Sequence, residues 1–292
     1  MNKFFAEIIA GIIPHKPTRN RWRGILRYGI INAVRLLKQL RDYRQYPCCY
    51  LAICTIAKNE GRYFKEWIDW HHRHGVEKFY IYDNESNDNT TEVLKPYIDA
   101  GIVEYTWFPG YRRQLAAYDD CLERHRFEAH WIAFIDMDEF IVPLKEPSIT
   151  HFLKKFEGFA AVEINWLIYG SSGKIMKEDG NVMERFKRHA RPDHFLNRQV
   201  KSIVNPRKVF NMIGCHEASR ISGKTADSHM SPVRKHFRDR EPQLDIIRIN
   251  HYAVRSYEEF AEKQARGRAS GTQRTIDLSY FKMYDLNDIE DA

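Results

Sequence analysis

Residues 131–143 read WIAFIDMDEFIVP, in which an apolar run is interrupted by carboxylates and then resumes. The run from Trp131 to Ile135 predicts a buried strand, because a short uninterrupted apolar stretch is typical of a strand covered on both faces. Asp136 and Asp138 follow directly, and their spacing of two points both carboxylates to one face of an extended segment. Oxygen ligands suit a hard or borderline divalent ion, so this stretch predicts a Mn²⁺ or Mg²⁺ site at the end of a strand.

Strand and helix patterns alternate on the N-terminal side of this stretch. The expected elements, beginning and ending with a strand, are 49–56, 63–74, 78–82, 90–100, 102–106, 113–124 and 131–135. Such alternation predicts right-handed β-α-β units, that is, an α/β fold with a mostly parallel sheet and helices on both faces. We expect this domain to occupy residues 47–270 and to be extended by helices at its C-terminal end. A C-terminal tail is expected at 271–292.

Polar clusters follow three of the expected strands. They are residues 58–60 (KNE), 83–89 (DNESNDN) and 136–139 (DMDE). Ligands of α/β sheets bind outside the carboxyl ends of the strands, which is where these clusters fall. None of them contains G-x-G-x-x-G or G-x-x-x-x-G-K-[ST], so neither a dinucleotide site nor a P-loop is indicated.

Composition excludes several protein classes. The chain has 292 residues, 43% of them hydrophobic, which argues against a disordered or collagenous protein. Its five cysteines are odd in number and never spaced C-x-x-C, so a disulfide framework or zinc ribbon is not expected and a reducing compartment fits. His71, His72 and His74 are expected to be structural, because they lie on a helix that packs on the sheet.

The positive charge of the chain is concentrated in an N-terminal arm, residues 1–46. This arm contains ten Lys or Arg and only two Asp or Glu, and apolar residues recur at helical spacing in 4–13 and 25–40. No apolar run approaches the roughly 20 residues that a membrane-spanning helix needs. The pattern predicts a basic amphipathic segment that lies on an anionic membrane surface.

The alternative for the arm is a pair of helices packed on the domain, with their lysines and arginines in solvent. Nucleic acid is not an expected partner, because the remaining chain has no basic stripe interleaved with stacking aromatic residues.

Five stretches, in the same order, resemble glycosyltransferase family 92 and related family 2-like sequences. They are CTIAKNEGRYFKEWIDWHHRHGVEKFYIYDNESNDNT (54–90), WIAFIDMDEFIVP (131–143), WLIYGSSG (166–173), VKSIVNPRKV (200–209) and HYAVRSYEEFAEKQARG (251–267). The resemblance covers about residues 50 to 270. It implies a GT-A fold and a glycosyltransferase that uses a nucleotide-sugar, expected to be a UDP-sugar, with a divalent metal and inversion at the sugar carbon.

The resemblance, together with the position of each residue and the chemistry of an inverting transfer, suggests roles for individual residues. The residues expected to bind the nucleotide-sugar are Thr55, Lys58, Asn59, Glu60, Asp83, Asn84, Gln114, Asp136 and Met137. The expected metal ligands are Asp136, Asp138 and a later histidine, for which His216 is preferred to His251. The residues expected to contact the acceptor are Gly170, Ser171, Ser172 and Gly173. The expected catalytic base is Glu184, with Asp179 and Glu217 as alternatives.

These inferences together predict transfer of a sugar to a glycan or lipid-linked oligosaccharide in bacterial surface-polysaccharide or lipopolysaccharide synthesis. The enzyme is expected to be cytoplasmic and peripheral on the inner membrane, because eukaryotic relatives usually carry a membrane-spanning anchor and the sequence contains no such run. Two other classes remain open: a membrane-tethered module that binds a nucleotide or glycan without catalysis, and a nucleotidyltransferase. The transferred sugar, the linkage and the oligomeric state are not predicted.

Overall fold

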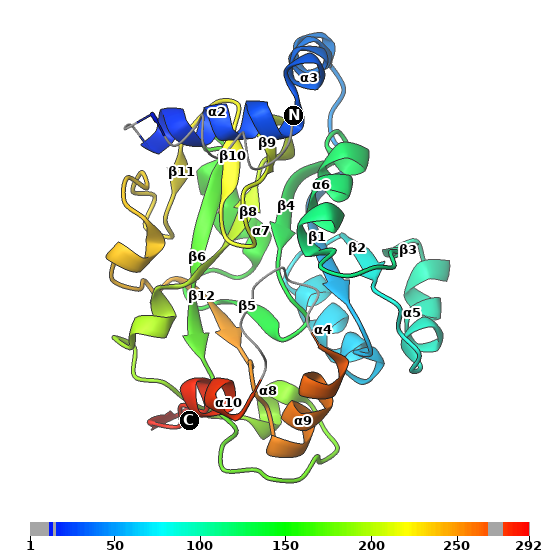
Figure 1. Cartoon of the computed structure of the whole chain (residues 1–292), viewed down its shortest axis with the longest axis vertical. Coiled ribbons are helices and arrows are strands. Elements are labelled where there is room, and N and C mark those ends of the chain that lie inside the picture. Colours follow the sequence, from blue (N-terminus) through cyan, green and yellow to red (C-terminus); the bar gives the residue numbers. More distant parts are fainter. Residues whose placement is uncertain (1–11, 14–15, 268–276, 292) are drawn as a thin grey trace.

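The computed structural model describes residues 12–13, 16–267 and 277–291 (Figure 1). The helices are α2 (Lys16–Tyr28), α3 (Ile30–Asp42), α4 (Gly61–Arg73), α5 (Thr90–Asp99), α6 (Gln114–His125), α7 (Ile149–Leu153), α8 (Val182–Arg185), α9 (Tyr257–Arg266) and α10 (Leu278–Tyr284). The strands are β1 (Cys49–Ala57), β2 (Lys78–Asp83), β3 (Val103–Trp107), β4 (Ala129–Phe134), β5 (Glu139–Pro143), β6 (Ala161–Ile168), β7 (Arg188–His189), β8 (Val200–Val204), β9 (Val209–Met212), β10 (Ala218–Arg220), β11 (Thr225–Ala226), β12 (Ile247–His251) and β13 (Ile289–Glu290).

One mixed sheet runs through the molecule in the order β3-β2-β1-β4-β8-β6-β12-β5, with β11 paired to β6. The first four strands are parallel. Strand β8 then runs antiparallel to both β4 and β6, while β12 is parallel to β6 and antiparallel to the edge strand β5. The expected α/β fold with a mostly parallel sheet is confirmed, and the expected strands and helices up to residue 135 match the observed ones to within about two residues.

Strand β1 shows why both faces of the sheet are covered. Because side chains alternate across a strand, Leu51 and Ile53 point to one face and Ala52 and Cys54 to the other. The first pair is buried in the core that contains the apolar side of α4, and the second pair in the core that contains α6. Helices therefore cover both faces, as the uninterrupted apolar run CYLAICTI predicts.

His71 confirms the structural role expected for the histidines of α4. Its side chain is fully buried, with Nδ1 2.8 Å from the Trp67 carbonyl and Nε2 accepting a hydrogen bond of 3.1 Å from the Ile141 amide. Burial lowers the pKa of His71 to about 3, so the ring is neutral at physiological pH. This histidine joins α4 to the edge strand β5 that begins beside the candidate site.

Helix α2 packs directly on the domain. A Cβ on Gly24 would lie 1.5 Å from the Ser219 hydroxyl of β10, so only glycine permits this approach of helix and strand. Arg27 donates a 2.9 Å hydrogen bond to the Ile213 carbonyl, and the Tyr28 and Phe210 ring centroids are 6.2 Å apart. For α2 the structure thus realises the packed-helix alternative.

Helix α3 is covered on one side only. It buries Ala33 and Leu36 and leaves a second apolar face exposed, formed by Ile30, Ile31, Val34 and Leu37. Gly29, with φ of 92°, separates α3 from α2 and redirects the chain between them. The apolar residues of 4–11 lie outside the described residues. Among the described helices none combines the length and apolarity that crossing a bilayer requires.

Candidate active site

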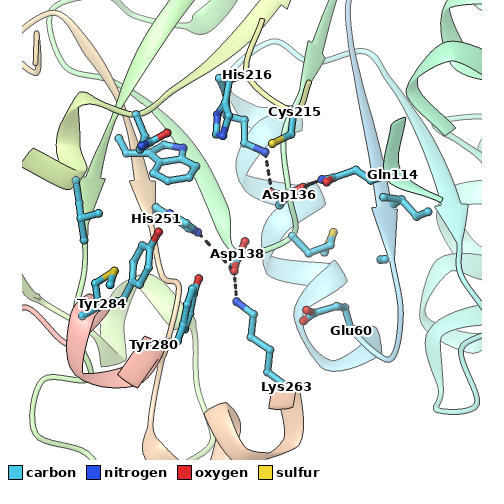
Figure 2. Close-up of a pocket in the computed structure, with 18 of the residues that line it drawn as sticks. Glu60, Gln114, Asp136, Asp138, Cys215, His216, His251, Lys263, Tyr280 and Tyr284 are labelled. Atoms are coloured by element: carbon cyan, nitrogen blue, oxygen red, sulfur yellow. Dashed lines mark hydrogen bonds and ion pairs between the residues drawn. The ribbon is translucent and has the colours of Figure 1, made fainter. Parts of the chain in front are cut away.

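A cavity of about 950 Å³ lies at the carboxyl ends of β1 and β4, where the polar clusters were expected. Residues of α6, β6, β8, β12, α9 and α10 and of nearby loops also line it. Figure 2 shows Asp136 and Asp138 near the middle of the cavity, with Gln114 and Glu60 on one side and His216 and His251 on the other. The cavity thus contains several of the residues that the sequence singled out.

The two aspartates occupy a turn and not the extended segment that their spacing predicted. The Glu139 amide donates to the Asp136 carbonyl at 3.1 Å, which closes a four-residue turn between β4 and β5. The turn forms because β5 must start at Glu139 to pair with β12, so the chain reverses over these four residues. The expectation of one shared face is therefore wrong, and the carboxylates take separate partners.

Asp136 is held from three directions. Gln114 Nε2 donates to its Oδ1 at 2.7 Å, and the Tyr118 hydroxyl lies 3.3 Å from the same oxygen. The Lys201 ammonium donates to Oδ2 at 2.7 Å. Gln114 and Tyr118 are one turn apart on α6, so the helix presents both to one carboxylate. Gln114, which was expected to bind the nucleotide-sugar, lines the cavity and donates its side-chain hydrogen bond to Asp136.

Lys201 and Glu139 are buried next to Asp136. Lys201 is 1% exposed, and its ammonium lies 3.3 Å from the Glu139 carboxylate, which is itself fully buried. Burial alone would lower the pKa of Lys201, but Asp136 and Glu139 raise it well above its usual value. Burial also raises the pKa of Glu139, more than the nearby Lys201 lowers it. We therefore assign the ion pair to Lys201 and Asp136.

Asp138 faces the opposite side of the cavity. Lys263 of α9 donates to its Oδ2 at 2.5 Å, and the same ammonium donates to the Ala253 carbonyl at 2.7 Å. Nε2 of His251 lies 3.6 Å from that carboxylate oxygen (Figure 2). Burial would raise the pKa of Asp138, but Lys263 and His251 hold it well below the usual range. Asp138 is therefore ionised at physiological pH.

Glu60 brings two more cations to the cavity. Its carboxylate accepts hydrogen bonds from Arg255, at 3.2 Å, and from Arg266. Arg255 is buried, and its guanidinium lies 3.6 Å from the centroid of the Tyr63 ring. Each carboxylate of the cavity is thus paired with a Lys or Arg side chain from the C-terminal half of the chain.

The loops after β1 and β2 use their polar groups on each other. The Asn59 amide donates to Ser86 Oγ, and the Asn87 amide donates to Asn59 Oδ1, both at 2.8 Å. Asn59 was expected to bind the nucleotide, but its side-chain oxygen accepts from Asn87 and its backbone amide donates to Ser86, and both bonds hold the two loops together. It does not line the cavity.

Asp83 and Asn84 have the same local role. The Tyr105 hydroxyl donates to Asp83 at 2.7 Å, and the Ser86 amide donates to its other oxygen at 2.8 Å. The Asn84 amide group donates to the carbonyls of 108 and 110 at 3.1 and 2.9 Å. Both side chains are buried, and neither lines the cavity. The structure therefore does not bring these two expected nucleotide-binding residues to the cavity.

Of the other residues expected to bind nucleotide, Lys58 and Met137 line the cavity. Thr55 is fully buried within β1 and does not, and its hydroxyl has no partner among the described residues. Lys58 is half-buried at the end of β1, and no ion pair joins it to another described residue. It is thus a cation at the cavity wall that is positioned to meet an anionic ligand.

Glu184, the expected base, is exposed on α8 and does not line the cavity. Its carboxylate accepts a 3.0 Å hydrogen bond from Asn181. The next residue, Arg185, is buried and makes a bidentate ion pair with Glu259, at 2.8 and 3.0 Å. Because neighbouring residues of a helix point in different directions, this buried pair leaves Glu184 facing solvent.

The alternative bases are not in the cavity either. Asp179 is exposed and pairs with Arg62 at 3.3 Å. Glu217 precedes β10 and is absent from the cavity lining. The carboxylates that do line it are Glu60, Asp136 and Asp138.

The glycine-serine loop 170–173 packs against the C-terminal segment. The Ser171 amide donates to Asp285 at 2.7 Å, and the Ser172 amide donates to Asn287 at 2.8 Å. A Cβ on Gly170 would lie 2.5 Å from Asn287 Oδ1, so the contact requires glycine here. The loop was expected to touch the acceptor, but none of its four residues lines the cavity.

The two histidines considered as metal ligands occupy different places. His216, the preferred one, has Nδ1 2.6 Å from the Val200 carbonyl, and burial together with Lys201 lowers its pKa to about 4. His251 pairs in register with Glu139 across β12 and β5, which brings it to Asp138. The structure therefore favours His251 over His216 as the imidazole beside the aspartates. The sequence could not show this, because strand pairing decides it.

The cavity holds ligand types that suit a divalent ion. Asp136 and Asp138 offer carboxylate oxygens and His251 offers an imidazole, although in the described part of the chain the ligand atoms of these three residues do not all lie within 4.8 Å of one another. The ammonium groups of Lys201 and Lys263 lie against these same carboxylates, so both sites already stabilise positive charge.

A second group of chelating side chains lies elsewhere in the described part of the chain. Glu104, His125 and Glu128 present ligand atoms within 4.8 Å of one another. His125 directs one ring nitrogen to each carboxylate, at 3.5 and 2.8 Å, and Arg124 pairs with Glu104 at 2.5 Å. These groups already satisfy one another, and none of them lines the cavity.

The model of the glycosyltransferase family 92 matches residues 50–281, which is most of the chain and includes all of the cavity lining except Met283 and Tyr284. The chain belongs to glycosyltransferase family 92. The family assignment agrees with the resemblance of the sequence, and it makes the protein a glycosyltransferase.

Proteins similar to this chain include those of plants and of a nematode. A family 92 protein of Ricinus communis is 29% identical over 77% of this chain and 38% of its own length. A galactan beta-1,4-galactosyltransferase of Arabidopsis thaliana is 30% identical over 64% of this chain and 38% of its own length. A beta-1,4-galactosyltransferase of Caenorhabditis elegans is 25% identical over 80% of this chain and 53% of its own length. The chain thus spans only part of these longer relatives.

Solved structures resemble the chain only distantly. S. aureus TarS in complex with UDP matches 54% of this chain and 47% of its own, with 12% identity and a TM-score of 0.37. Glucosyl-3-phosphoglycerate synthase of Mycobacterium tuberculosis, in complex with Mn²⁺ and UDP-glucose, matches 40% of this chain and 44% of its own, with 19% identity and a TM-score of 0.29.

The sequence did not predict several cavity residues that lie inside the stretches resembling family 92, among them Lys201, Lys263 and Arg266. Lys201 is a lone charge inside the apolar run VKSIV, and this is the signal that could have marked it. Lys263 and Arg266 stand three apart, so they share one face of α9. The sequence also contains a signal for the start of that helix, because Ser256 and Glu259 have the spacing of a capping box and form one in the structure.

Proposed function

We propose that this chain transfers a sugar from a UDP-sugar to a glycan hydroxyl, with a divalent metal and with inversion at the sugar carbon. The proposal depends most on one observation: Asp136 and Asp138 lie in a cavity at the carboxyl ends of the parallel strands, and each is paired with a lysine. A carboxylate pair in such a place is suited to a metal-bound diphosphate, which is the leaving group of a nucleotide-sugar.

The metal, when bound, neutralises the charge that develops on the departing diphosphate. The protein adds its own cations to the same task. Lys58 lines the cavity near the end of β1, and Lys263 and Arg266 approach from α9. Because such groups are fixed before the reaction, they stabilise the developing negative charge without reorganisation.

Inversion requires a group that accepts the proton of the attacking hydroxyl. We place this acceptor among the cavity-lining groups that do not hold the metal, and Glu60 is the carboxylate among them. Glu184, Asp179 and Glu217 lie outside the lining, and a base must come within hydrogen-bond reach of its proton.

Galactose is the first sugar to test. The Arabidopsis and Caenorhabditis relatives carry the name beta-1,4-galactosyltransferase, and for the Arabidopsis protein the name adds galactan. We therefore propose UDP-galactose as donor and a β-1,4-linked galactan oligosaccharide as the first acceptor. The roles in bacterial surface polysaccharide and lipopolysaccharide stay predictions of the sequence.

The proposal includes a peripheral position on the cytoplasmic face of the inner membrane. It is supported by the exposed apolar face of α3, whose neighbours include Arg35 and Lys38. Burying this face in lipid while the basic residues meet anionic headgroups would stabilise binding. Co-sedimentation with phosphatidylglycerol vesicles tests this, and a variant with Ile31→Glu and Val34→Glu should stay in the supernatant. Equal pelleting of both proteins would contradict it.

The experiment that tests the catalytic proposal is release of UDP from UDP-galactose in the presence of β-1,4-galactotetraose and Mn²⁺. We expect release with Mn²⁺, loss of release with EDTA, and a β-linked product by the ¹H coupling of its anomeric proton. UDP binding without turnover of any donor would indicate a binding module. Pyrophosphate released from UTP and a sugar phosphate would indicate a nucleotidyltransferase, and either result would overturn the proposal.

A further inference from the structure

One side of the cavity is a continuous series of aromatic rings. The ring centroids of His216 and Trp166 are 5.5 Å apart, those of Trp166 and His251 4.2 Å, and those of His251 and Tyr284 6.1 Å. Tyr284 stacks on Tyr280 with centroids 4.4 Å apart. All five rings line the cavity, and we call them the aromatic wall. They come from β6, β12, α10 and the segment before β10, so only the fold brings them together.

The aromatic wall lies across the cavity from the parallel strands. Figure 2 shows His251, Tyr280 and Tyr284 on one side of Asp138, and Gln114 and Glu60 on the other. The parallel strands β1 and β4 end on the side of Gln114 and Glu60, where the fold favours the nucleotide. The wall is therefore on the side left for the second substrate, next to the carboxylate at the centre.

We infer that the aromatic wall binds the acceptor, and that a sugar ring of a glycan packs against Tyr280 and Tyr284. This inference rests on the proposed transfer to a glycan. A pyranose ring has an apolar face of C–H groups and a rim of hydroxyls, so an aromatic surface with polar edges complements it. Tyr284 is 9% exposed and Tyr280 is half-buried, so the wall has limited conformational freedom to lose on binding.

Two polar atoms within the wall lack partners in the described part of the chain. They are Trp166 Nε1 and His251 Nδ1, in side chains that are more than nine-tenths buried. Buried donors and acceptors are nearly always satisfied in native proteins, by protein, water or ligand. Both atoms are shielded from solvent, so a bound sugar would contact the ring faces of the aromatic wall and not these two atoms.

The glycine-serine loop then has a positioning role. By holding Asp285 and Asn287, loop 170–173 fixes the chain directly after α10. Helix α10 carries Tyr280 and Tyr284, so the loop sets where these rings stand in the cavity. The loop would thus affect acceptor binding without touching the acceptor.

Tyr280→Ala tests the inference, because Tyr280 is the less buried of the two tyrosines. We expect the KM for β-1,4-galactotetraose to rise about tenfold, in line with the loss of a ring contact, while the KM for UDP-galactose and the affinity for UDP with Mn²⁺ stay unchanged. Tyr280→Phe keeps the ring and should restore the acceptor KM. Tyr46→Ala, at a tyrosine that is 95% exposed and outside the cavity, should leave all values unchanged.

An unchanged acceptor KM in a folded Tyr280→Ala protein would overturn the inference. A loss of UDP affinity in that variant would overturn it as well, because the ring would then bind the nucleotide. Saturation-transfer NMR with galactotetraose, UDP and Mn²⁺ separates this inference from the proposed function, since it needs no turnover. If the wild-type protein binds the oligosaccharide and Tyr280→Ala does not, the wall is the glycan site even when no donor reacts. If the wild-type protein gives no saturation transfer to the oligosaccharide, and so does not bind it, the inference is overturned.

Discussion

The loops after β1 and β2 differ from the turn after β4 in what their polar side chains contact. Asn59, Asp83 and Asn84 make hydrogen bonds to nearby amides, hydroxyls and carbonyls, and these bonds close the loops. Asp136 and Asp138 instead pair with Lys201 and Lys263, which come from distant parts of the chain. Similar residues after neighbouring strands thus serve two purposes. Local hydrogen bonds fix the conformation of the loops, and long-range ion pairs form the charged part of the cavity.

Asp138→Asn should show the largest effect on activity. The substitution removes a charge that Lys263 and His251 hold ionised, and we expect UDP release to fall by at least about 100-fold, as for other losses of transition-state electrostatics. Manganese binding measured by electron paramagnetic resonance should weaken as well. Asp83→Asn is the matched control in the other region, with a rate within about threefold of wild type and about 1 kcal/mol lower stability. Equal rate losses in both variants would remove the distinction.

Lys201→Met tests the buried side of the charged region. It leaves Asp136 without its ammonium partner, and the free energy of unfolding should fall by about 3 to 5 kcal/mol. Urea unfolding followed by circular dichroism measures this. Lys263→Met, at a side chain that is 20% exposed, should cost about 1 kcal/mol, because solvent can replace the lost partner. A Lys201→Met protein as stable as the wild type would show that its charge is not needed by the fold.

Acid should weaken the buried ion pair between Arg185 and Glu259. Hydrogen bonds from Arg185, Ser256 and Tyr63 outweigh burial and lower the pKa of Glu259 from 4.5 to about 2. The stability that Glu259 contributes is therefore complete above about pH 4.5 and is lost as the pH falls toward 2. Glu259→Gln should lower the free energy of unfolding by about 3 kcal/mol at pH 7. The difference in free energy of unfolding between the variant and the wild type should become smaller below pH 4.5. A constant difference down to pH 2.5 would contradict the lowered pKa of Glu259.

Glu184→Gln should have the smallest effect. The carboxylate is exposed and bonded only to Asn181 among the described residues, so we expect UDP release within about twofold of wild type. The assay used for Asp138→Asn measures this. A loss of 100-fold or more would restore Glu184 as the base and would mean that α8 moves when substrates bind.

Much of this molecule could be predicted from local patterns. The apolar runs at 49–56 and 131–135 predicted β1 and β4, and the alternation with helices predicted the parallel half of the sheet. Asp136, Asp138, Lys58 and Glu60 were placed at the cavity because the carboxyl ends of parallel strands meet at one edge. Asn59 and Asp83 were placed there for the same reason. The structure does not bring them to the cavity, because a side chain at that edge can also form hydrogen bonds within the neighbouring loops.

The residues by themselves determined the α/β fold, the two aspartates at a strand end and the membership of glycosyltransferase family 92, because each of these follows from short runs and ordered motifs. Only the tertiary structure decided that His251 and not His216 stands by Asp138, and that Lys201 and Lys263 pair with the two carboxylates. The antiparallel pairing of β5 with β12 and the packing of α9 join residues more than 100 positions apart. A spacing along the chain cannot carry that information, since the register between distant strands is set by the packing of the whole sheet.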